Sequence, residues 1–393
     1  MSGTLSRTRL PTLSLPIAIM RWCSSIRPGR RRGCAVSDET ADPLLLGQRV
    51  VAILETGLRT ATYKLATLMA LIDHCIENMP RQASDVLEVP IPDLAHRVLE
   101  IYWQQVRPFE GNELRQSTQR RARILNATTA LRRAAGITGT TVSVDIAKLR
   151  APDAYRSAID EITLCLAQQP LHRLQKLPGS SASDPFLYDD SFLHDQVSRS
   201  TLRARGDAIQ LKPGVAHGLA RLAGLLKPAL EIMWVDDVRR MNKFLYDKVP
   251  DVAGHLFGRE RAALAAVREP FKEAFGPHCF YCGTHLPVSN PIDHVLPWSL
   301  VGIDGLANLV LACARCNCDK SGALPAVSIV DRVLERDREV LEQIASQIQW
   351  PTQHERVVAA ARGIYRGQRA GVPTWSGYKQ SERLDIRFAQ AWR

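Results

Sequence analysis

The sequence predicts an α+β fold, with a mostly helical N-terminal region, a small cysteine-rich unit of strands and turns, and a C-terminal helix. Apolar residues recur at helical spacing through much of 42–177 and again through 219–233. Between 271 and 325 the pattern changes to cysteines, prolines, glycines and short β-branched runs. The helical pattern returns at 328–350. This change of period, from helical to short extended runs and back, is typical of an α+β chain.

Residues 1–41 are predicted to form a basic tail outside any folded domain. The first 36 contain seven arginines and no acid, so the formal charge of +11 falls to +4 without them. An apolar run at 13–20 is followed at once by Arg21, with no small-residue cleavage site, which disfavours a secretory signal. A disordered segment, a start assigned too far upstream and a nucleic-acid-binding arm all remain open interpretations.

Residues 42–270 are predicted to form several packed helices. A loop at 178–185, rich in small residues and bracketed by prolines, is the best internal boundary and would separate two subdomains. No apolar run reaches the length of about 18 residues that a membrane span needs, so a membrane protein is not predicted. After the cysteine-rich unit, 328–393 is predicted to be a helix with an extension, and Ser328 and Asp331 have the spacing of a capping box.

The cysteines indicate a bound metal. Cys279 and Cys282 form one pair with two intervening residues, and Cys313 and Cys316 form a second. Two such pairs close a tetrahedral four-sulfur zinc site, which is structural because it leaves no position for water. Cys318 falls outside this spacing. Clustered thiols in a chain without an export signal indicate a reducing compartment, so we expect a cytoplasmic protein.

Four polar residues accompany these cysteine pairs: Asp293, His294, Asn308 and Asn317. Residues 292–297 are predicted to form a short strand in which Asp293 and His294 point to opposite faces. A second strand at 309–311 is expected to lead into a helix that starts near Cys313. An Asp-His pair alone is a weak signal, but framed by two cysteine pairs at these spacings the set is specific.

These residues resemble the HNH endonuclease family, especially its zinc-containing restriction, phage and mobile-element members. The matching motifs are Cys-x-Tyr-Cys-Gly at 279–283, Asp-His-Val-Leu-Pro-Trp-Ser at 293–299, Asn-Leu-Val-Leu-Ala-Cys at 308–313 and Cys-Asn-x-x-Lys at 316–320. The predicted nuclease domain is 271–327. The resemblance implies a metal-dependent endonuclease that cleaves DNA, and it suggests a role in defence against foreign DNA.

The chemistry of phosphodiester hydrolysis assigns roles to these residues. A base must take a proton from the attacking water, and His294 titrates closest to neutral pH. Asp293 and Asn317 carry hard oxygen donors suited to one Mg²⁺ or Mn²⁺, and the resemblance implies that they hold this ion beside His294. Asn308 is predicted to brace the loop between the strands through hydrogen bonds to its backbone.

The charge expected of a DNA-binding surface lies outside the predicted nuclease domain. Residues 271–325 contain three cations and four acids, whereas 115–136 contain six arginines and no acid in a segment of good helix formers. Such a helix would neutralise phosphates, although a face paired to acids elsewhere is an equally weighted alternative. The predicted nucleic-acid contacts are Arg120, Arg121, Arg123 and Lys320. Arg315 is a further candidate, and a solvated helix face is the alternative for both Arg315 and Lys320.

Other interpretations of the whole chain remain open. An RNA substrate is compatible with the motif, and so is a non-catalytic zinc module that binds nucleic acid or protein. A scaffold needs only the cysteines, so the presence of Asp293, His294, Asn308 and Asn317 together favours the enzyme. A homodimer is also left open. Gly363-Ile-Tyr365 is similar to a motif of another nuclease family, but its partner motif is not evident and chance is the better account.

Overall fold

The computed structural model describes the chain from 42 onward, with gaps. The described residues are 42–55, 59–118, 122–138, 142–176, 185–245, 252–257, 261–385, 387 and 392. Contacts divide the chain into Met1–Ser37 and Asp38–Arg393, and every described residue belongs to the second unit. The predicted tail at 1–41, the predicted loop up to residue 184, and Arg120 and Arg121 therefore lie outside the described residues.

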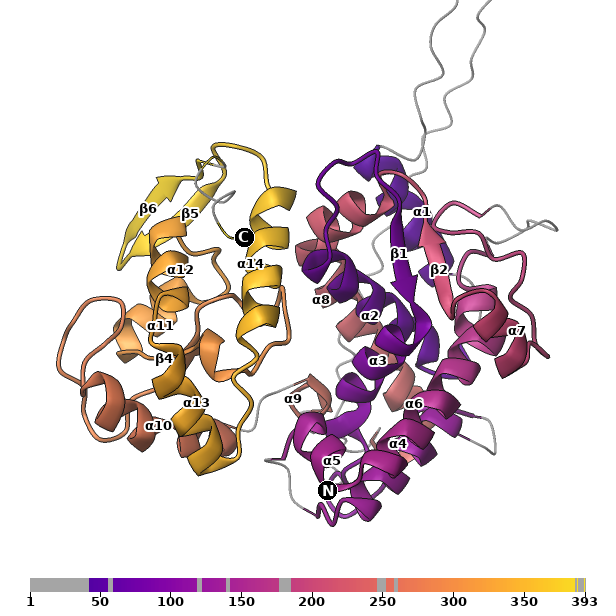
Figure 1. The fold of residues 1–393 in the computed structure, drawn as a ribbon, viewed down its shortest axis with the longest axis horizontal. Coiled ribbons are helices and arrows are strands. Elements are labelled where there is room, and N and C mark those ends of the chain that lie inside the picture. Colours follow the sequence, from indigo (N-terminus) through magenta and orange to yellow (C-terminus); the bar gives the residue numbers. More distant parts are fainter. Residues whose placement is uncertain are drawn as a thin grey trace, which may run out of the picture. The chain divides into compact units, whose positions relative to one another are not determined.

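The N-terminal part is helical, as predicted. Its helices are α1 (Pro43–Glu55), α2 (Tyr63–Glu77), α3 (Ile91–Gln105), α4 (Arg123–Ala134), α5 (Val144–Arg150), α6 (Pro152–Leu166), the π-helix η2 (Ala167–Leu171), α7 (Arg199–Ala204), α8 (Val215–Met241), the 3₁₀ turn η3 (Lys243–Leu245) and α9 (Val252–Phe257). Strand β1 (Leu87–Pro90) pairs antiparallel with β2 (Ala208–Leu211). Figure 1 shows these elements in indigo to magenta.

Helix α2 lies at the centre of this region. Its apolar residues are not confined to one stripe, and nearly every side chain is buried, as expected for a helix enclosed by others. It packs against α3, α8 and α14. The positions predicted from apolar spacing, including Leu65, Leu68 and Leu71, are buried.

The predicted basic helix at 115–136 is shorter than expected. Helix α4 begins only at Arg123, and the described residues 113–116 have no regular secondary structure. Arg132 is buried, donates to the carbonyl of Trp103 at 3.0 Å and stacks over its ring. Arg132 is therefore not part of an exposed cationic face.

The cysteine-rich segment has the predicted order of two strands and a helix. Helix α10 (Arg261–Phe275) precedes β3 (Ile292–His294), which ends at His294 instead of Pro297. A 3₁₀ turn, η4 (Leu306–Asn308), leads into β4 (Leu309–Leu311), and β3 and β4 pair antiparallel with His294 opposite Leu309. Helix α11 (Ala314–Lys320) follows, and the Cys313 sulfur caps it by accepting from the amide of Cys316. The fold class is therefore α+β, as predicted.

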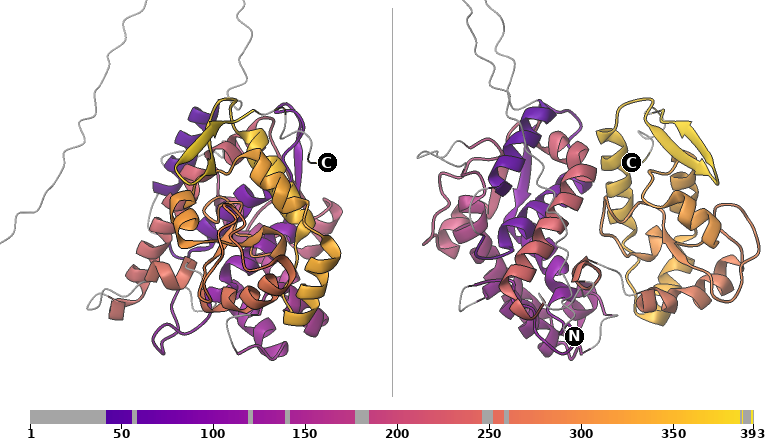
Figure 2. Two further views of the ribbon diagram at one scale, coloured as in Figure 1. Left: turned by 90° about the vertical axis from the view of Figure 1, so that its left-hand side faces the viewer. Right: turned by 180° about the vertical axis from the view of Figure 1, so that it is seen from behind.

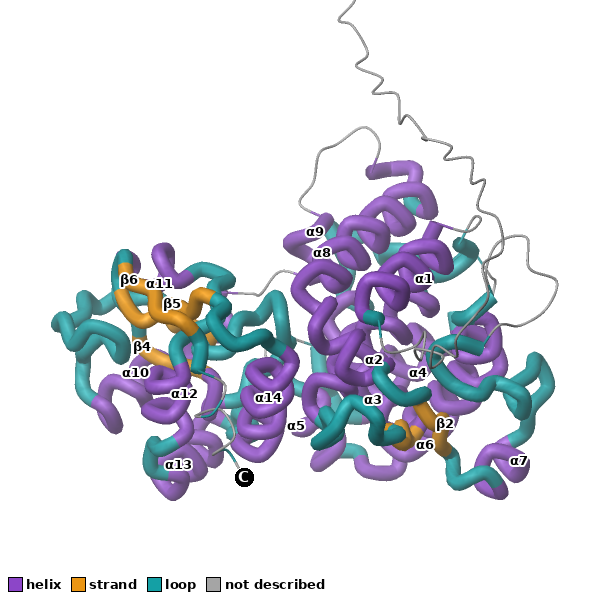
Figure 3. The backbone as a smooth tube through the Cα atoms, turned by 90° about the horizontal axis from the view of Figure 1, so that it is seen from above, coloured by secondary structure: helices purple, strands orange, loops and turns teal. Residues whose placement is uncertain are grey.

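The predicted single helix at 328–350 is wrong. It is divided into α12 (Val327–Leu334) and α13 (Arg338–Ile348), because the side chain of Asp337 caps α13 by accepting from the amides of Glu339 and Val340. The proposed capping box at Ser328 does not form, since Ala326 occupies the N-cap position. The chain continues through α14 (His354–Gly367) and a hairpin of β5 (Pro373–Gly377) and β6 (Gln380–Arg383). Figure 2 shows this hairpin in yellow, and Figure 3 shows the strands as short pairs among helices.

Helix α14 packs closely against α2. A Cβ atom at Gly363 would lie 1.6 Å from the carbonyl oxygen of Ile76, so only glycine fits there. Arg356 adds ion pairs to Glu77 at 3.0 Å and to Glu100 at 2.9 Å. Gly363 therefore has a structural role. From the sequence alone, its Gly-Ile-Tyr motif is only a chance similarity. Among the described helices, none has the length and apolar character to cross a membrane.

Candidate functional site

The four paired cysteines converge on one point. Their sulfur atoms all lie within 4.8 Å of one another, and the sulfurs of Cys282 and Cys313 are 3.8 Å apart. A tetrahedral zinc ion with Zn–S bonds of about 2.3 Å would hold its sulfurs roughly 3.8 Å apart. The cluster joins the turn after α10 to the start of α11, so the four cysteines are placed to hold a metal ion and the donor set fits zinc.

The pKa values of the cysteine thiols also indicate that this cluster needs a bound cation. Burial raises the pKa of Cys279 and of Cys316. Burial also raises that of Cys282, but hydrogen bonds with Thr284 outweigh this and bring its pKa down to about 6. A protein that holds four thiolates together must supply compensating positive charge, and a divalent metal does so when it displaces the protons. Cys318 is exposed and lies outside the cluster.

Asp293 is held on β3 by two donors. Burial raises the pKa of Tyr281 well above its usual value, so its hydroxyl stays protonated and donates to Oδ2 of Asp293 at 2.6 Å. The ammonium group of Lys320 lies 3.0 Å from the same oxygen. Both contacts use Oδ2, which leaves Oδ1 as the atom of Asp293 suited to an additional cation within the described part of the chain.

His294, the next residue on β3, faces a different partner. Its Nε2 lies 2.7 Å from Oδ1 of Asp304, and its ring packs edge-to-face on Trp298 with centroids 5.4 Å apart. Because a carboxylate accepts hydrogen bonds, we assign the ring proton to Nε2. In the neutral ring Nδ1 then carries the lone pair and is the nitrogen that can accept a proton. His294 itself is 1% exposed, whereas the side chain of Asp304 is 33% exposed.

Asn308 bonds to the backbone of the loop between the strands. Its side-chain oxygen accepts from the amide of Leu296 at 2.8 Å, and its side-chain nitrogen donates to the carbonyls of Leu296 and Ile303 at 3.2 and 3.1 Å. The side chain is fully buried. These contacts span the segment between His294 and Asp304, and so fix the separation at which the two side chains meet.

Helix α11 carries both Asn317 and Lys320, and the contacts of Lys320 face β3. Asn317 lies three positions before Lys320, a spacing typical of neighbours on a helix surface. Lys320 donates to the carbonyl of His294 at 2.7 Å in addition to its contact with Asp293, so its side chain is turned toward β3. Lys320 is 1% exposed. Its burial contradicts the predicted contact between Lys320 and a phosphate.

Of the three predicted arginines, the structure describes Arg123. Arg123 starts α4 and is half-buried, and its guanidinium lies 2.6 Å from Glu161 and 2.8 Å from the side chain of Gln168. Its charge is therefore already paired within the helical region. Arg120 and Arg121 are outside the described residues. The structure of Arg123 therefore matches the alternative interpretation, in which the basic residues pair with acids elsewhere in the chain and do not bind phosphates.

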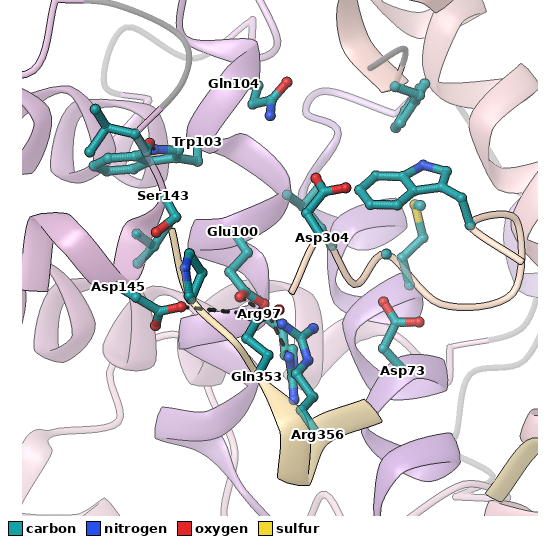
Figure 4. A pocket seen from close by; sticks show the side chains of 18 of the residues that line it. Asp73, Arg97, Glu100, Trp103, Gln104, Ser143, Asp145, Asp304, Gln353 and Arg356 are labelled. Carbon is teal, nitrogen blue, oxygen red and sulfur yellow. Dashed lines mark hydrogen bonds and ion pairs between the residues drawn. The ribbon is translucent and has the colours of Figure 1, made fainter. Parts of the chain in front are cut away.

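A cavity of about 210 Å³ borders Asp304 (Figure 4). Its lining includes Glu100 and Arg356, which are ion-paired, and Trp298. Asp304 lines this cavity, and its side chain is partly exposed to solvent. Asp293, His294 and Asn317 do not line it.

Two residues with direct contacts to the predicted site were absent from the sequence prediction. Asp304 follows His294 by ten positions in a loop, and no periodicity signals that the two side chains will meet. Tyr281 lies inside the first cysteine pair, and its contact with Asp293 depends on how that turn folds against β3. The acidic residue within the loop between the two predicted strands was the one available signal for Asp304.

Two family models match the chain. One, described as HNH endonuclease, matches residues 279–322, which contain the four cysteines and the Asp293-His294 pair. The other, described as Domain of unknown function (DUF8808), matches residues 45–250, more than half of the chain. No curated protein and no solved structure matches it.

Proposed function

Because the chain belongs to the family described as Domain of unknown function (DUF8808) and carries an HNH endonuclease domain at 279–322, we propose that it is a metal-dependent endonuclease that hydrolyses DNA. The observation that carries the proposal is the arrangement around β3. There, an Asp-His pair, a carboxylate partner for the imidazole and the ammonium group of Lys320 from α11 lie together. A purely structural metal module has no need of them.

In this proposal His294 is the general base. Asp304 holds the imidazole through Nε2, so Nδ1 takes the proton from the attacking water. Asn308 keeps the loop that bears Asp304 in place, and it acts on His294 only through that loop. Asp304 and Asn308 are therefore positioning residues, and His294 is the residue that handles the proton.

Asp293 and Asn317 would hold one divalent ion. Oδ1 of Asp293 and the side-chain oxygen of Asn317 are hard donors, which Mg²⁺ and Mn²⁺ prefer. When bound, such an ion supplies positive charge to the phosphate and the departing oxygen. The ammonium group of Lys320 lies 3.0 Å from the other oxygen of Asp293 and fixes the orientation of that carboxylate. The zinc at the four cysteines is a separate, structural ion.

One observation favours a second candidate function, a non-catalytic zinc module that binds nucleic acid. His294 is 1% exposed and Asp293 is 8% exposed, so a phosphodiester does not reach the base in this arrangement without movement of the surrounding side chains.

We also propose a cytoplasmic location, since all seven cysteines in the described residues are free of disulfides.

The two candidates differ in their dependence on Asp293. Purified protein is incubated with supercoiled plasmid, and separately with RNA, in Mg²⁺, in Mn²⁺ and in a chelator. The nuclease is expected to convert one of these substrates only when a divalent ion is present, and Asp293→Ala is expected to lose this activity. A protein that binds nucleic acid equally well with and without Asp293, and cleaves neither substrate, would instead be the non-catalytic module.

A further inference from the structure

A cationic and aromatic cluster lies on the surface where the C-terminal hairpin meets α11. Arg315 lies over the ring of Tyr378 at 4.7 Å from its centroid, and the ammonium group of Lys379 lies 5.4 Å from the same centroid. All three side chains are exposed. We call these three residues the hairpin cluster. Tyr378 and Lys379 form the two-residue turn between β5 and β6, more than 50 positions after Arg315 in the sequence.

The hairpin is fixed to the nuclease segment, so the hairpin cluster has a defined place. Asp319 accepts from Nε1 of Trp375 and from the amide of Lys379, both at 2.8 Å. Trp375 packs edge-to-face on Tyr281 with centroids 5.0 Å apart. These contacts attach the turn to the helix that carries Cys316 and Asn317, one and two positions after Arg315.

The turn holds Lys379 in an uncommon backbone conformation. Its φ is 56°, in the left-handed region that glycine or asparagine adopts with less strain. A residue with a side chain is strained in this region, and such strain concentrates at functional positions. The strain is maintained here by the hydrogen bond from the Lys379 amide to Asp319. The turn thus presents a cation where a glycine would be easier to accommodate.

The charges at this surface favour an anionic partner. The carboxylate of Asp319 accepts hydrogen bonds from Trp375 and Lys379 but keeps its charge, so it offsets one of the cations at this surface. Strand β6 is exposed along its length and adds Arg383 against one acid, Glu382. Residues 271–325 contain one more acid than base with Arg315 already counted, so Lys379 and Arg383 are the cations that the hairpin adds to this domain. An aromatic ring flanked by two cations suits a phosphate backbone with a sugar or base beside it.

We propose that the hairpin cluster of Arg315, Tyr378 and Lys379 binds the phosphate backbone of a nucleic acid and holds it beside the nuclease domain. The identity of the partner rests on the proposed function. Arg315 and Lys379 each contact a phosphate, and the Tyr378 ring keeps the two cations oriented and packs on the sugar or base between them. The surface contributes affinity and register without reading sequence.

The test measures binding without cleavage, using the full chain with His294→Ala and a duplex DNA labelled at one end. Arg315→Gln with Lys379→Gln removes both cations. The matched control is Arg338→Gln with Arg387→Gln, which removes two exposed cations that are paired with Glu355 and Asp385. Both doubles change the formal charge equally, and loss of exposed ion pairs has little effect on folding. Dissociation constants are measured from 50 to 300 mM salt and repeated with RNA.

We expect the cluster variant to reduce the slope of log binding constant against log salt by about 2, since each lost phosphate contact removes about 0.9. The control double variant is expected to change it by less than half as much. Tyr378→Ala is expected to weaken binding by about 5- to 50-fold, as loss of one stacking contact does. Metal content and thermal midpoint must match those of the parent for each variant.

If both doubles give the same slope and affinity on DNA and on RNA, the proposal is overturned, and an acidic protein surface becomes the better candidate for this cluster. The result is separable from the proposed function. Plasmid cleavage by the wild-type chain, together with an unchanged slope, removes the hairpin cluster alone. A reduced slope, together with no cleavage by the wild-type chain, removes the nuclease proposal and leaves the binding surface standing.

Discussion

Replacing Asp304 with asparagine tests the assignment of His294 as the base. The amide keeps the shape of the carboxylate but removes its charge and offers a neutral acceptor at the 2.7 Å contact with Nε2. A hydrogen bond to a charged group contributes about 1.5–3 kcal/mol, and the one-third exposure of Asp304 argues for the lower half of this range. A loss of about 2 kcal/mol corresponds to about 30-fold in rate.

The assay is single-turnover cleavage of a plasmid between pH 5 and 9 with saturating divalent ion. Asp304→Asn is expected to be about 30-fold slower, and the acid limb of its rate profile is expected to move to lower pH, since the carboxylate stabilises the protonated ring. Asp304→Glu should recover part of the rate, and Glu335→Gln, at an exposed acid after α12, serves as the control. If Asp304→Asn cleaves within twofold of wild type with an unchanged profile, His294 does not act through this pair.

Three further predictions concern stability and metal content. Cys282→Ser should lower bound zinc from about one per chain to near zero, while Cys318→Ser, outside the cluster, should keep it; equal zinc in both would refute the four-cysteine site. Gly363→Ala should cost about 3 kcal/mol in urea unfolding because its Cβ meets the Ile76 carbonyl oxygen at 1.6 Å. Gly367→Ala on the same helix should cost much less, since its Cβ meets its neighbours only at 3.4 Å or more, which is ordinary contact. Equal costs would contradict the close packing. Burial lowers the pKa of His74 to about 4 from an ordinary 6.5, so the unfolded chain is protonated at a higher pH than the folded chain. The free energy of unfolding therefore falls by about 3 kcal/mol in all as the pH is lowered from 6.5 to 4. His74→Gln should flatten this part of the curve of unfolding free energy against pH, and an unchanged curve would rule out His74 as its source.

The parts of the fold that the sequence predicted depend on local patterns. Apolar spacing located α2 and α3, because buried helices must place apolar residues at helical period. The cysteine pairs located the metal-binding cluster, since their spacing alone determines that each pair can face one ion. The order of β3, β4 and α11 followed from short apolar runs on either side of one loop.

What the sequence did not reveal depends on contacts between distant residues. The break between α12 and α13 lies at Glu-Arg-Asp, with no glycine or proline to mark it, and is stabilised by the Asp337 cap. The hairpin turn at Tyr378-Lys379 lacks the Asn-Gly signal of such turns. In the sequence Lys320 has the features of a surface cation, and its burial depends on the packing of α11 against β3. The contact of Arg123 with Glu161 depends in the same way on the packing of α4 against α6.

The central claim is that His294 carries out metal-dependent hydrolysis of a nucleic acid. Its most direct test compares wild type with His294→Ala at equal zinc content, on supercoiled plasmid and on RNA in Mg²⁺ or Mn²⁺. We expect wild type to nick or linearise the plasmid and the variant to leave it supercoiled. Equal cleavage by both proteins, or none by wild type on either substrate, would contradict the claim.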